Sequence, residues 1–335
     1  MSFVIDSSDW DFINLSCPEI ANILENFLDR LYIAKERGEE FFFGNEFQSK
    51  NVCRGMDLWT FLCSPESAEI DKGIKDELAS YINRGCFYED TENLWPPTFL
   101  KSDVTDSSGA IVGLDYAYAY HNLINNTPFA CISLRDKSKL PVSSTYGQLE
   151  IYFVNSEKSN LTFWRECALS TVRDTQENLH ILSSHLYPDL YFFKGVWDGI
   201  DSFEGGYSSV YQKLKKYLEV FNDYGNWIYS APPPAIHITD TINSTIGQKP
   251  TNELIEERFQ ALGLCVAPEK PDVRKNEKCR KEREIVINKT THYCEWHGKF
   301  EPHQNRIHVH GPTSHSAGKF IIAIFCKHLS LPKHK

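Results

Sequence analysis

The spacing of apolar residues along the chain predicts three long helices and a shorter one. Ser16 and Glu19 have the spacing of a capping box, and apolar residues then recur at helical spacing up to a glycine. The same periodicity predicts helices over Ala68–Arg84 and Ser208–Tyr224, each followed by a glycine that can end it. A shorter helix is expected at Asn252–Leu262.

Short runs of β-branched and aromatic residues predict strands between and after these helices. Two such runs are Pro128–Arg135 and Gln148–Val154. The C-terminal part then contains four more, REIVIN, HYCEWH, NRIHVH and GKFIIAIFCKHL, separated by turn residues. The pattern predicts an α+β protein, in which a mixed α/β body is followed by a small antiparallel β-rich domain.

A proline-rich stretch indicates where the body ends. The sequence APPPA at Ala231–Ala235 cannot continue a helix or a central strand, and the residues up to Pro250 lack periodicity. A chain of 335 residues is also long enough for two domains. We therefore expect an acidic α+β body over residues 1–232, a linker with a short helix over 233–282, and a basic, histidine-rich β domain over 283–335.

Composition narrows the class of protein. The chain is 41% hydrophobic and 24% charged, which is typical of a globular protein in water. Its longest apolar run, FIIAIFC, is much shorter than the ~20 residues of a membrane helix. The N-terminal sequence has no basic, apolar leader, and the ten cysteines form no CxxC pair, which favours reduced thiols. We expect a cytoplasmic protein that does not associate with a membrane.

Charge is distributed unevenly along the chain. Residues 270–335 contain fourteen Lys and Arg against six Asp and Glu, so they carry +8 of a total of −10, and residues 1–269 carry −18. A basic segment of this kind predicts a polyanionic partner, and we favour RNA among the nucleic acids. Two alternatives stay open: the basic segment docks on the chain's own acidic body, or the body itself binds a protein partner.

Seven of the twelve histidines lie between His292 and Leu329, which suggests acid–base chemistry on a phosphodiester. Cleavage of RNA without a metal needs a proton acceptor, a proton donor and cations beside the phosphate, and histidine titrates near neutral pH. Strand alternation in NRIHVH predicts that Arg306, His308 and His310 share one face. The candidate catalytic residues are His308, His310 and His303, and the candidate nucleic-acid-binding residues are Lys299, Arg306, Lys327 and His328. Binding without cleavage, and a plain polar surface, are equally open.

A zinc site is the competing interpretation of the same segment. Cys294, His297, Cys326 and His328 together offer the two sulfurs and two nitrogens that zinc accepts. However, residues two apart on a strand have Cβ atoms ~6.6 Å apart, which is poor geometry for one tetrahedral ion. We therefore expect neither a metal nor another cofactor.

The segment CEWHGKFEPHQNRIHVH, followed by GKFIIAIFCKHL, resembles the terminal hairpin of small RelE/ParE-type toxins, in which a basic strand lies beside an apolar one. These segments and LYPDLYFFKGVWDGIDSFEGGY also resemble parts of larger bacterial conflict-system proteins of the phage-defence or toxin-like kind. The resemblance covers roughly residues 186–224 and 283–331. It implies a bacterial conflict-system protein whose basic domain acts on RNA. The most specific form of this hypothesis is that the basic domain is a metal-independent endoribonuclease. The long acidic body departs from the small-toxin plan, so the alternative is a non-catalytic adaptor or sensor that binds nucleic acid or a protein.

Overall fold

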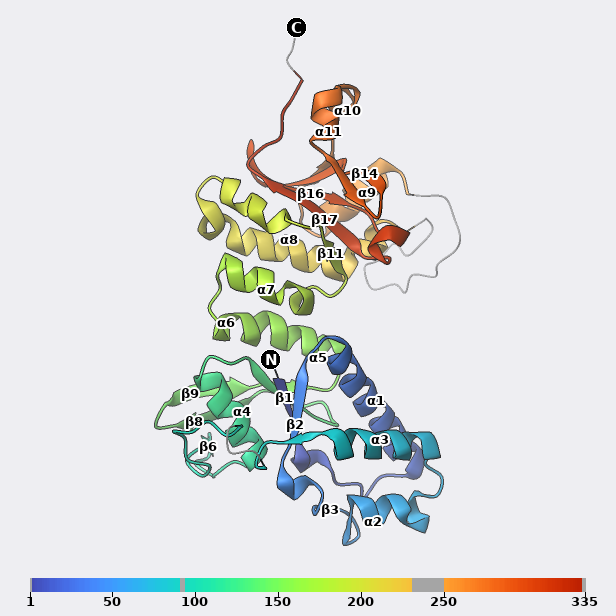
Figure 1. Cartoon of the computed structure of the whole chain (residues 1–335), viewed down its shortest axis with the longest axis vertical. Coiled ribbons are helices and arrows are strands. Elements are labelled where there is room, and N and C mark those ends of the chain that lie inside the picture. Colours follow the sequence, from blue (N-terminus) through green and yellow to red (C-terminus); the bar gives the residue numbers. More distant parts are fainter. Residues whose placement is uncertain (1, 91–93, 231–249, 333–335) are drawn as a thin grey trace. The chain divides into compact units, whose positions relative to one another are not determined.

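The computed structural model of the chain describes residues 2–90, 94–230 and 250–332 (Figure 1). The fold is α+β, as predicted, and the chain divides into two compact units, Met1–Asp174 and Thr175–Lys335. We call these unit 1 and unit 2 and describe each by itself. No helix within the described ranges combines the length and the apolar character needed to cross a membrane.

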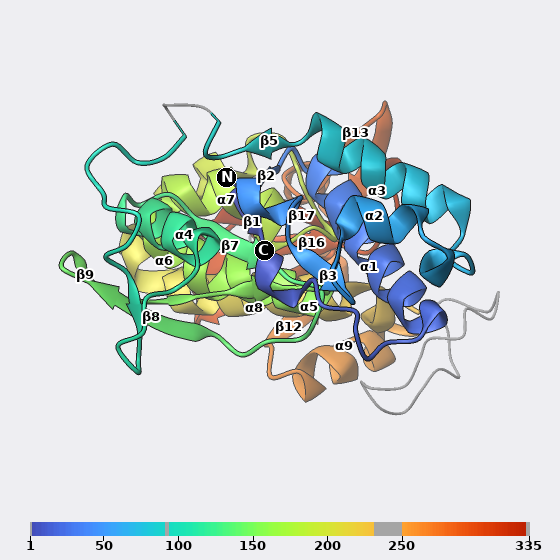
Figure 2. The ribbon, with the colours of Figure 1, turned by 90° about the horizontal axis from the view of Figure 1, so that it is seen from below.

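Unit 1 is built on a parallel sheet of five strands in the order β10-β7-β1-β2-β5. Every residue of the central strand β1 is buried, as expected for a strand of a parallel sheet that is covered on both faces. Helices α1 and α3 lie side by side on one side of β1, and α4 lies on the other (Figures 1 and 2). The strands of this sheet are β1 (Ser2–Ile5), β2 (Glu40–Phe43), β5 (Cys86–Phe87), β7 (Phe129–Ile132) and β10 (Phe153–Val154).

Smaller elements complete unit 1. Its helices are α1 (Cys17–Glu36), α2 (Leu58–Cys63), α3 (Lys72–Arg84), α4 (Leu114–Ile124), α5 (Glu157–Thr162) and α6 (Leu169–Thr171), with a π-helical turn at Phe163–Ala168 and 3-10 turns at Ser7–Asp9, Asn45–Phe47 and Pro65–Ser67. A hairpin joins β3 (Asn51–Cys53) to β4 (Met56–Asp57), and a second, antiparallel sheet contains β6 (Thr105–Asp106), β8 (Leu140–Ser144) and β9 (Gly147–Ile151).

The strand order of the parallel sheet singles out one place on its edge. From β1 the chain moves outward through β2 to β5, and then returns to form β7 on the other side of β1 and finally β10. The order therefore reverses between β1 and β7. In open α/β sheets, ligands bind outside the carboxyl ends of the strands at this kind of switch point.

Unit 2 contains a mixed sheet in the order β11-β17-β16-β15-β12, in which only β11 and β17 are parallel. Its strands are β11 (Leu190–Phe192), β12 (Val266–Pro268), β15 (Trp296–Glu301), β16 (Gln304–His310) and β17 (Phe320–Cys326), and a separate hairpin pairs β13 (Glu284–Ile287) with β14 (Thr290–Tyr293). Its helices are α7 (Gln176–Leu186), α8 (Gly206–Ile228), α9 (Asn252–Ala261), α10 (Pro271–Lys275) and α11 (Glu277–Lys281), with 3-10 helices at Val196–Ser202 and Ser314–Ser316.

Helix α8 covers one face of this sheet (Figure 1). The ring of Tyr217 lies 5.1 Å from that of Phe300, and the ring of Phe221 stacks on Phe320 at 4.9 Å. Gly298 lets the helix approach, because a Cβ there would lie 2.6 Å from the Tyr217 ring. Since neighbouring residues of a strand face opposite ways, His297 and Lys299 of β15 and Arg306 and His308 of β16 lie on the other face.

Most of the predicted elements are present, with shifted ends. Helix α1 begins with the predicted capping box of Ser16 and Glu19. Helix α3 begins at Lys72 instead of Ala68, because the Asp71 side chain accepts a hydrogen bond from the backbone of Gly73 and caps the helix there. The run HYCEWH is divided between β14 and β15, and Gln148–Val154 is divided between β9 and β10. The APPPA segment lies outside the described residues.

The division into units differs from the predicted boundaries at residues 232 and 283. Strand β11 pairs with β17, with Leu190 opposite Phe320, and α8 packs on the same sheet, so the chain from residue 175 onward belongs to the C-terminal unit. Residues 271–281, expected to be part of a linker, form helices α10 and α11. These contacts join distant parts of the sequence, which local periodicity does not reveal.

Replacing Gly199 with alanine is expected to destabilise unit 2. A Cβ at this position would lie 2.1 Å from the backbone oxygen of Phe325 in β17, so the 3-10 helix at Val196–Ser202 would have to move away from the sheet. Overpacking of this kind costs about 1–3 kcal/mol. Denaturant unfolding would measure the cost, with Gly113→Ala as a control because a Cβ there meets no atom within 4 Å. Equal stability of the two variants would contradict the close approach.

Candidate functional site

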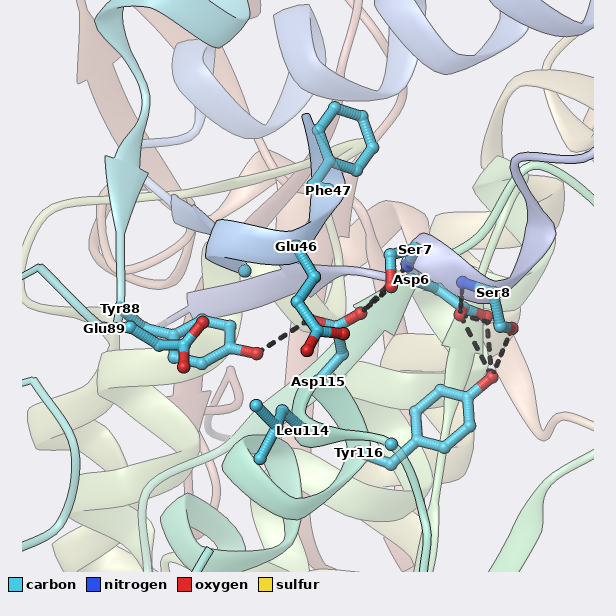
Figure 3. A pocket seen from close by; sticks show the side chains of 12 residues that line it. Asp6, Ser7, Ser8, Glu46, Phe47, Tyr88, Glu89, Leu114, Asp115 and Tyr116 are labelled. Carbon is cyan, nitrogen blue, oxygen red and sulfur yellow. Dashed lines mark hydrogen bonds between the residues drawn. The ribbon is translucent and has the colours of Figure 1, made fainter. Parts of the chain in front are cut away.

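A pocket of about 130 Å³ lies at the carboxyl edge of the parallel sheet in unit 1 (Figure 3). Its walls come from the segments that follow β1, β2 and β5 and from the first turn of α4. The polar side chains that line it are Asp6, Ser7, Ser8, Glu46, Tyr88, Glu89, Asp115 and Tyr116. The pocket borders the switch point of the sheet, because Asp6 directly follows β1.

Asp115 is a buried carboxylate held by three donors. It lies in the first turn of α4 and is 7% exposed. The backbone N–H and the hydroxyl of Ser7 donate to its Oδ2 at 3.0 and 2.6 Å, and the Tyr88 hydroxyl donates to Oδ1 at 2.9 Å (Figure 3). Burial raises the pKa of Asp115, and these hydrogen bonds oppose the rise only in part.

A partly buried lysine joins two further carboxylates. The Lys137 Nζ lies 2.5 Å from Oδ2 of Asp6 and 2.5 Å from Oδ1 of Asp9, and it also donates to the Ser8 hydroxyl at 3.0 Å. Burial lowers the pKa of Lys137, but its bonds to the two carboxylates outweigh burial and raise that pKa. Burial also raises the pKa of Asp9, whose Oδ2 is buried and has no hydrogen-bond partner in the part of the chain that the structure describes.

Negative charge exceeds positive charge around this pocket. Of its four carboxylates, Asp6 pairs with Lys137 and Glu89 pairs with Lys101 at 3.3 Å. Glu46 and Asp115 form no ion pair with any residue that the structure describes. The arrangement therefore favours binding of a further cation.

Coordination chemistry restricts which cation fits. Among residues 2–90, 94–230 and 250–332, no three or more His, Cys, Asp or Glu side chains already surround a position for a metal. This argues against a closed zinc cage. Magnesium, however, keeps several of its waters and binds proteins through one or two carboxylates together with substrate phosphates. Asp6 and Asp115 meet that smaller requirement.

Sequence reasoning missed this site. Its local signal is the buried run SFVI of β1 followed directly by DSSD, since a carboxylate directly after a buried parallel strand lies at the edge where ligands bind. The sequence alone did not show that Asp115 and Lys137 lie beside Asp6. Their proximity depends on the pairing of β1 with β7.

A second pocket, of about 400 Å³, lies in unit 2 on the face of the sheet that α8 does not cover. Five of the seven predicted site residues line it, namely Lys299, His303, Arg306, His308 and His328. The pairing of β15 with β16 explains this: His297 lies opposite His308, and Lys299 lies opposite Arg306. Residues of α10 and the segment after β17 form the other walls.

The two central histidines of this pocket are uncharged at neutral pH, with His308 buried and His297 partly buried. The rings of His297 and His308 lie 5.5 Å apart, and their Nδ1 atoms lie 3.6 and 3.9 Å from Oε1 of Glu269. Neither Nδ1 has a hydrogen-bond partner among the described residues. Burial lowers the pKa of His297 to about 3 and that of His308 well below its usual value. Since His308 is 1% exposed, its position favours a structural role over direct proton transfer to a ligand.

The basic side chains of this pocket differ in whether they are accessible to a ligand. Arg306 is 6% exposed, and its Nη1 donates to the carbonyls of Glu301 and Gln304 at 2.8 and 2.6 Å. By contrast, Lys299 is partly exposed and forms no ion pair with a described residue, and His303 and His328 are exposed. These three side chains are the ones that a ligand in the pocket can contact.

Two predicted residues lie elsewhere. The extra residue of the register shift lies in β17, and β16 pairs with β15 without a break, so the alternation that places Arg306 and His308 on one face continues to His310. His310 ends the strand, however, and does not line this pocket. Instead, His310 lines a different pocket, where its ring lies 5.3 Å from that of His292. Lys327 forms an ion pair with Glu204.

The four residues of the competing zinc interpretation do not form one cluster among the described residues. His297 and His328 both line the pocket of unit 2. Cys294 instead belongs to an apolar cluster with Ile285 and Ile321, where burial raises the pKa of its thiol to about 12. A thiol that resists deprotonation in this way is a poor metal ligand.

Comparison of the chain with protein-family models, with curated proteins and with solved structures gave no match in any of the three.

Proposed function

We propose that unit 1 is a divalent-cation-dependent hydrolase of phosphate esters. The observation that carries the proposal is the convergence of the Asp6 and Asp115 carboxylates on one pocket at the switch point of a parallel sheet. When bound there, Mg²⁺ would stabilise negative charge on a phosphoryl oxygen and lower the pKa of a bound water. Perturbed pKa values of Asp9, Asp115 and Lys137 in one place are also typical of functional sites.

The residues around the pocket have distinct roles in this proposal. Asp6 and Asp115 bind the cation, while Ser7 and Tyr88 hold the Asp115 carboxylate in place. Lys137 keeps its positive charge at neutral pH and supplies a fixed cation beside Asp6. Because burial raises the pKa of Asp115, cation binding should strengthen as the pH rises and that carboxyl group loses its proton.

Replacing Asp6 with asparagine is expected to lower kcat/KM about 100-fold or more, because metal-ion stabilisation contributes several kcal/mol to such reactions. The assay would use the full-length protein with p-nitrophenyl phosphate, bis(p-nitrophenyl) phosphate and an RNA oligonucleotide, each with Mg²⁺, Mn²⁺ or EDTA. Asp76→Asn is the matched control, since Asp76 is an exposed residue of α3 outside the pocket. Activity that persists in EDTA or in the Asp6→Asn variant would refute the proposal.

A second candidate function is RNA binding by unit 2, as part of a bacterial conflict system. Its support is the pocket that gathers Lys299, His303 and His328, together with the basic strand β16 beside the apolar β17. The same strand arrangement is part of the resemblance to RelE/ParE-type toxins. Since His308 is buried, we propose that unit 2 binds RNA without cutting it, as in the adaptor alternative. Cleavage by unit 2 would need the exposed His303 or His328.

Replacing Lys299 with glutamate is expected to weaken RNA binding by the full-length protein and to reduce its dependence on salt. Lys319→Glu makes the same change of charge, but Lys319 precedes β17 and does not line the pocket. Binding would be measured by fluorescence anisotropy over a series of salt concentrations. An equal loss in both variants would mean that only net charge matters. RNA cleavage in EDTA that His303→Ala abolishes would restore the metal-independent endoribonuclease hypothesis.

A further inference from the structure

Another pocket, of about 590 Å³, opens on the same carboxyl edge of unit 1. It lies between the segment that follows β7 and the segment that follows β10. Three lysines line it, Lys137, Lys139 and Lys158, against one acidic residue, Asp136. Its charge is thus opposite to that of the carboxylate pocket described above.

Lys137 connects the two pockets. Its side chain lines the basic pocket, and its Nζ is bonded to Asp6, which lines the carboxylate pocket. The Tyr116 hydroxyl donates to both oxygens of Asp6, at 3.0 and 3.1 Å, and so helps to fix this carboxylate. A basic and an acidic pocket therefore share one partly buried ion pair at the switch point of the sheet.

The other two lysines differ in their availability. Lys139 bonds to Glu166 at 2.6 Å and lies over the ring of Tyr152 at 4.4 Å, so its position is fixed and its charge is partly neutralised. Lys158 is exposed and has no ion pair among the residues that the structure describes. An anion in this pocket would therefore meet Lys158 first, and Lys137 at its inner end.

We propose that this basic pocket binds a phosphate group of the substrate, which places that phosphate next to the cation held by Asp6. The proposal rests on the proposed hydrolase function, because it assigns the substrate-binding part of the same site. Lysine is a point-charge ligand for phosphate, and two lysines at a concave surface give such an ion a defined position.

The test is direct binding of inorganic pyrophosphate to the full-length protein in EDTA, measured by isothermal titration calorimetry. We expect the wild type to bind and Lys158→Glu to bind at least 10-fold more weakly. Lys72→Glu makes the same change in net charge at an exposed residue of α3 outside the pocket, and it should bind like the wild type. No binding by the wild type, or equal weakening in the two variants, would overturn the proposal.

The same variants separate this inference from the hydrolase proposal. If pyrophosphate binds as expected but no phosphate ester is hydrolysed with any divalent cation, the phosphate site stands and the hydrolase function fails. If hydrolysis depends on Mg²⁺ and on Asp6, but Lys158→Glu leaves KM for an RNA oligonucleotide unchanged, the hydrolase function stands and the phosphate site is wrong.

Discussion

Unit 2 is expected to lose about 5 kcal/mol of its free energy of unfolding as the pH falls from 6.5 to 4.5. The reason is that a histidine kept neutral by burial lowers the free energy of unfolding by about 1.4 kcal/mol for each pH unit below its unfolded pKa. His297 and His308 both have folded-state pKa values far below 6.5, owing to burial. In the unfolded chain both take up protons in this range, whereas in the folded protein neither does. The stabilising contribution of each neutral histidine is therefore complete above pH 6.5. It decreases as the pH falls, until the pH reaches the pKa of that histidine in the folded protein, which is about 3 for His297.

The measurement has to report on unit 2 alone. Burial raises the pKa of Asp9 and Asp115 in unit 1, so those groups bind more protons in the folded state and oppose the trend there. Hydrogen exchange of the amides of β15 and β16, followed over this pH range, resolves the difference between the units. A histidine NMR titration is the control, since an ordinary pKa near 6.5 for His297 would contradict both its burial and the expected loss of stability.

The features that the sequence revealed are those determined by neighbouring residues. The Ser16–Glu19 capping box and the apolar periodicity that follows it were sufficient to locate α1. Alternation in NRIHVH placed Arg306 and His308 on one face, and the hairpin pairing of β15 with β16 brought Lys299 beside them. Hairpins join segments that are close in sequence, so the pocket of unit 2 was partly predictable.

The features that the sequence did not reveal depend on contacts between distant segments. Asp6 and Lys137 meet only because β1 pairs with β7. Strand alternation also did not reveal that His310, at the end of β16, lines a separate pocket beside His292 of β14, because alternation gives the face of a side chain and not the segments that pack on that face.

The boundary between the units changes the electrostatic argument as well. Unit 1 contains fifteen Lys and Arg against twenty-seven Asp and Glu, a net charge of −12, while unit 2 contains twenty against eighteen, a net charge of +2. The charge of +8 on residues 270–335 is thus largely balanced within unit 2 itself. Attraction for a polyanion is therefore expected at the pocket around Lys299 and not over the whole unit. The acidic character of unit 1 makes a bound cation all the more necessary for any phosphate substrate there.

Replacing Arg283 with methionine is expected to destabilise unit 2 by about 3–5 kcal/mol at pH 8, the usual cost of leaving one partner of a buried ion pair uncompensated. Arg283 is 2% exposed, and its Nε lies 2.6 Å from Oε1 of Glu269. Its Nη1 also donates to the carbonyl of Cys279 at 2.8 Å. The variant would leave the Glu269 carboxylate, whose side chain is 7% exposed, without its nearest cation.

The same variant should also weaken the pH dependence described above. Once Arg283 is removed, the nearest groups able to carry positive charge beside Glu269 are His297 and His308, whose Nδ1 atoms lie 3.6 and 3.9 Å away. Protonation of His297 would then be favoured, so the Arg283→Met variant should lose less stability on acidification than the wild type. Arg280→Met is the matched control, because Arg280 forms an exposed pair with Glu284 at 3.1 Å, and such pairs contribute less than about 1 kcal/mol. If the two variants were equally stable at pH 8, or if the Arg283→Met variant followed the wild-type pH profile, Glu269 would not be the group that controls the charge of these histidines.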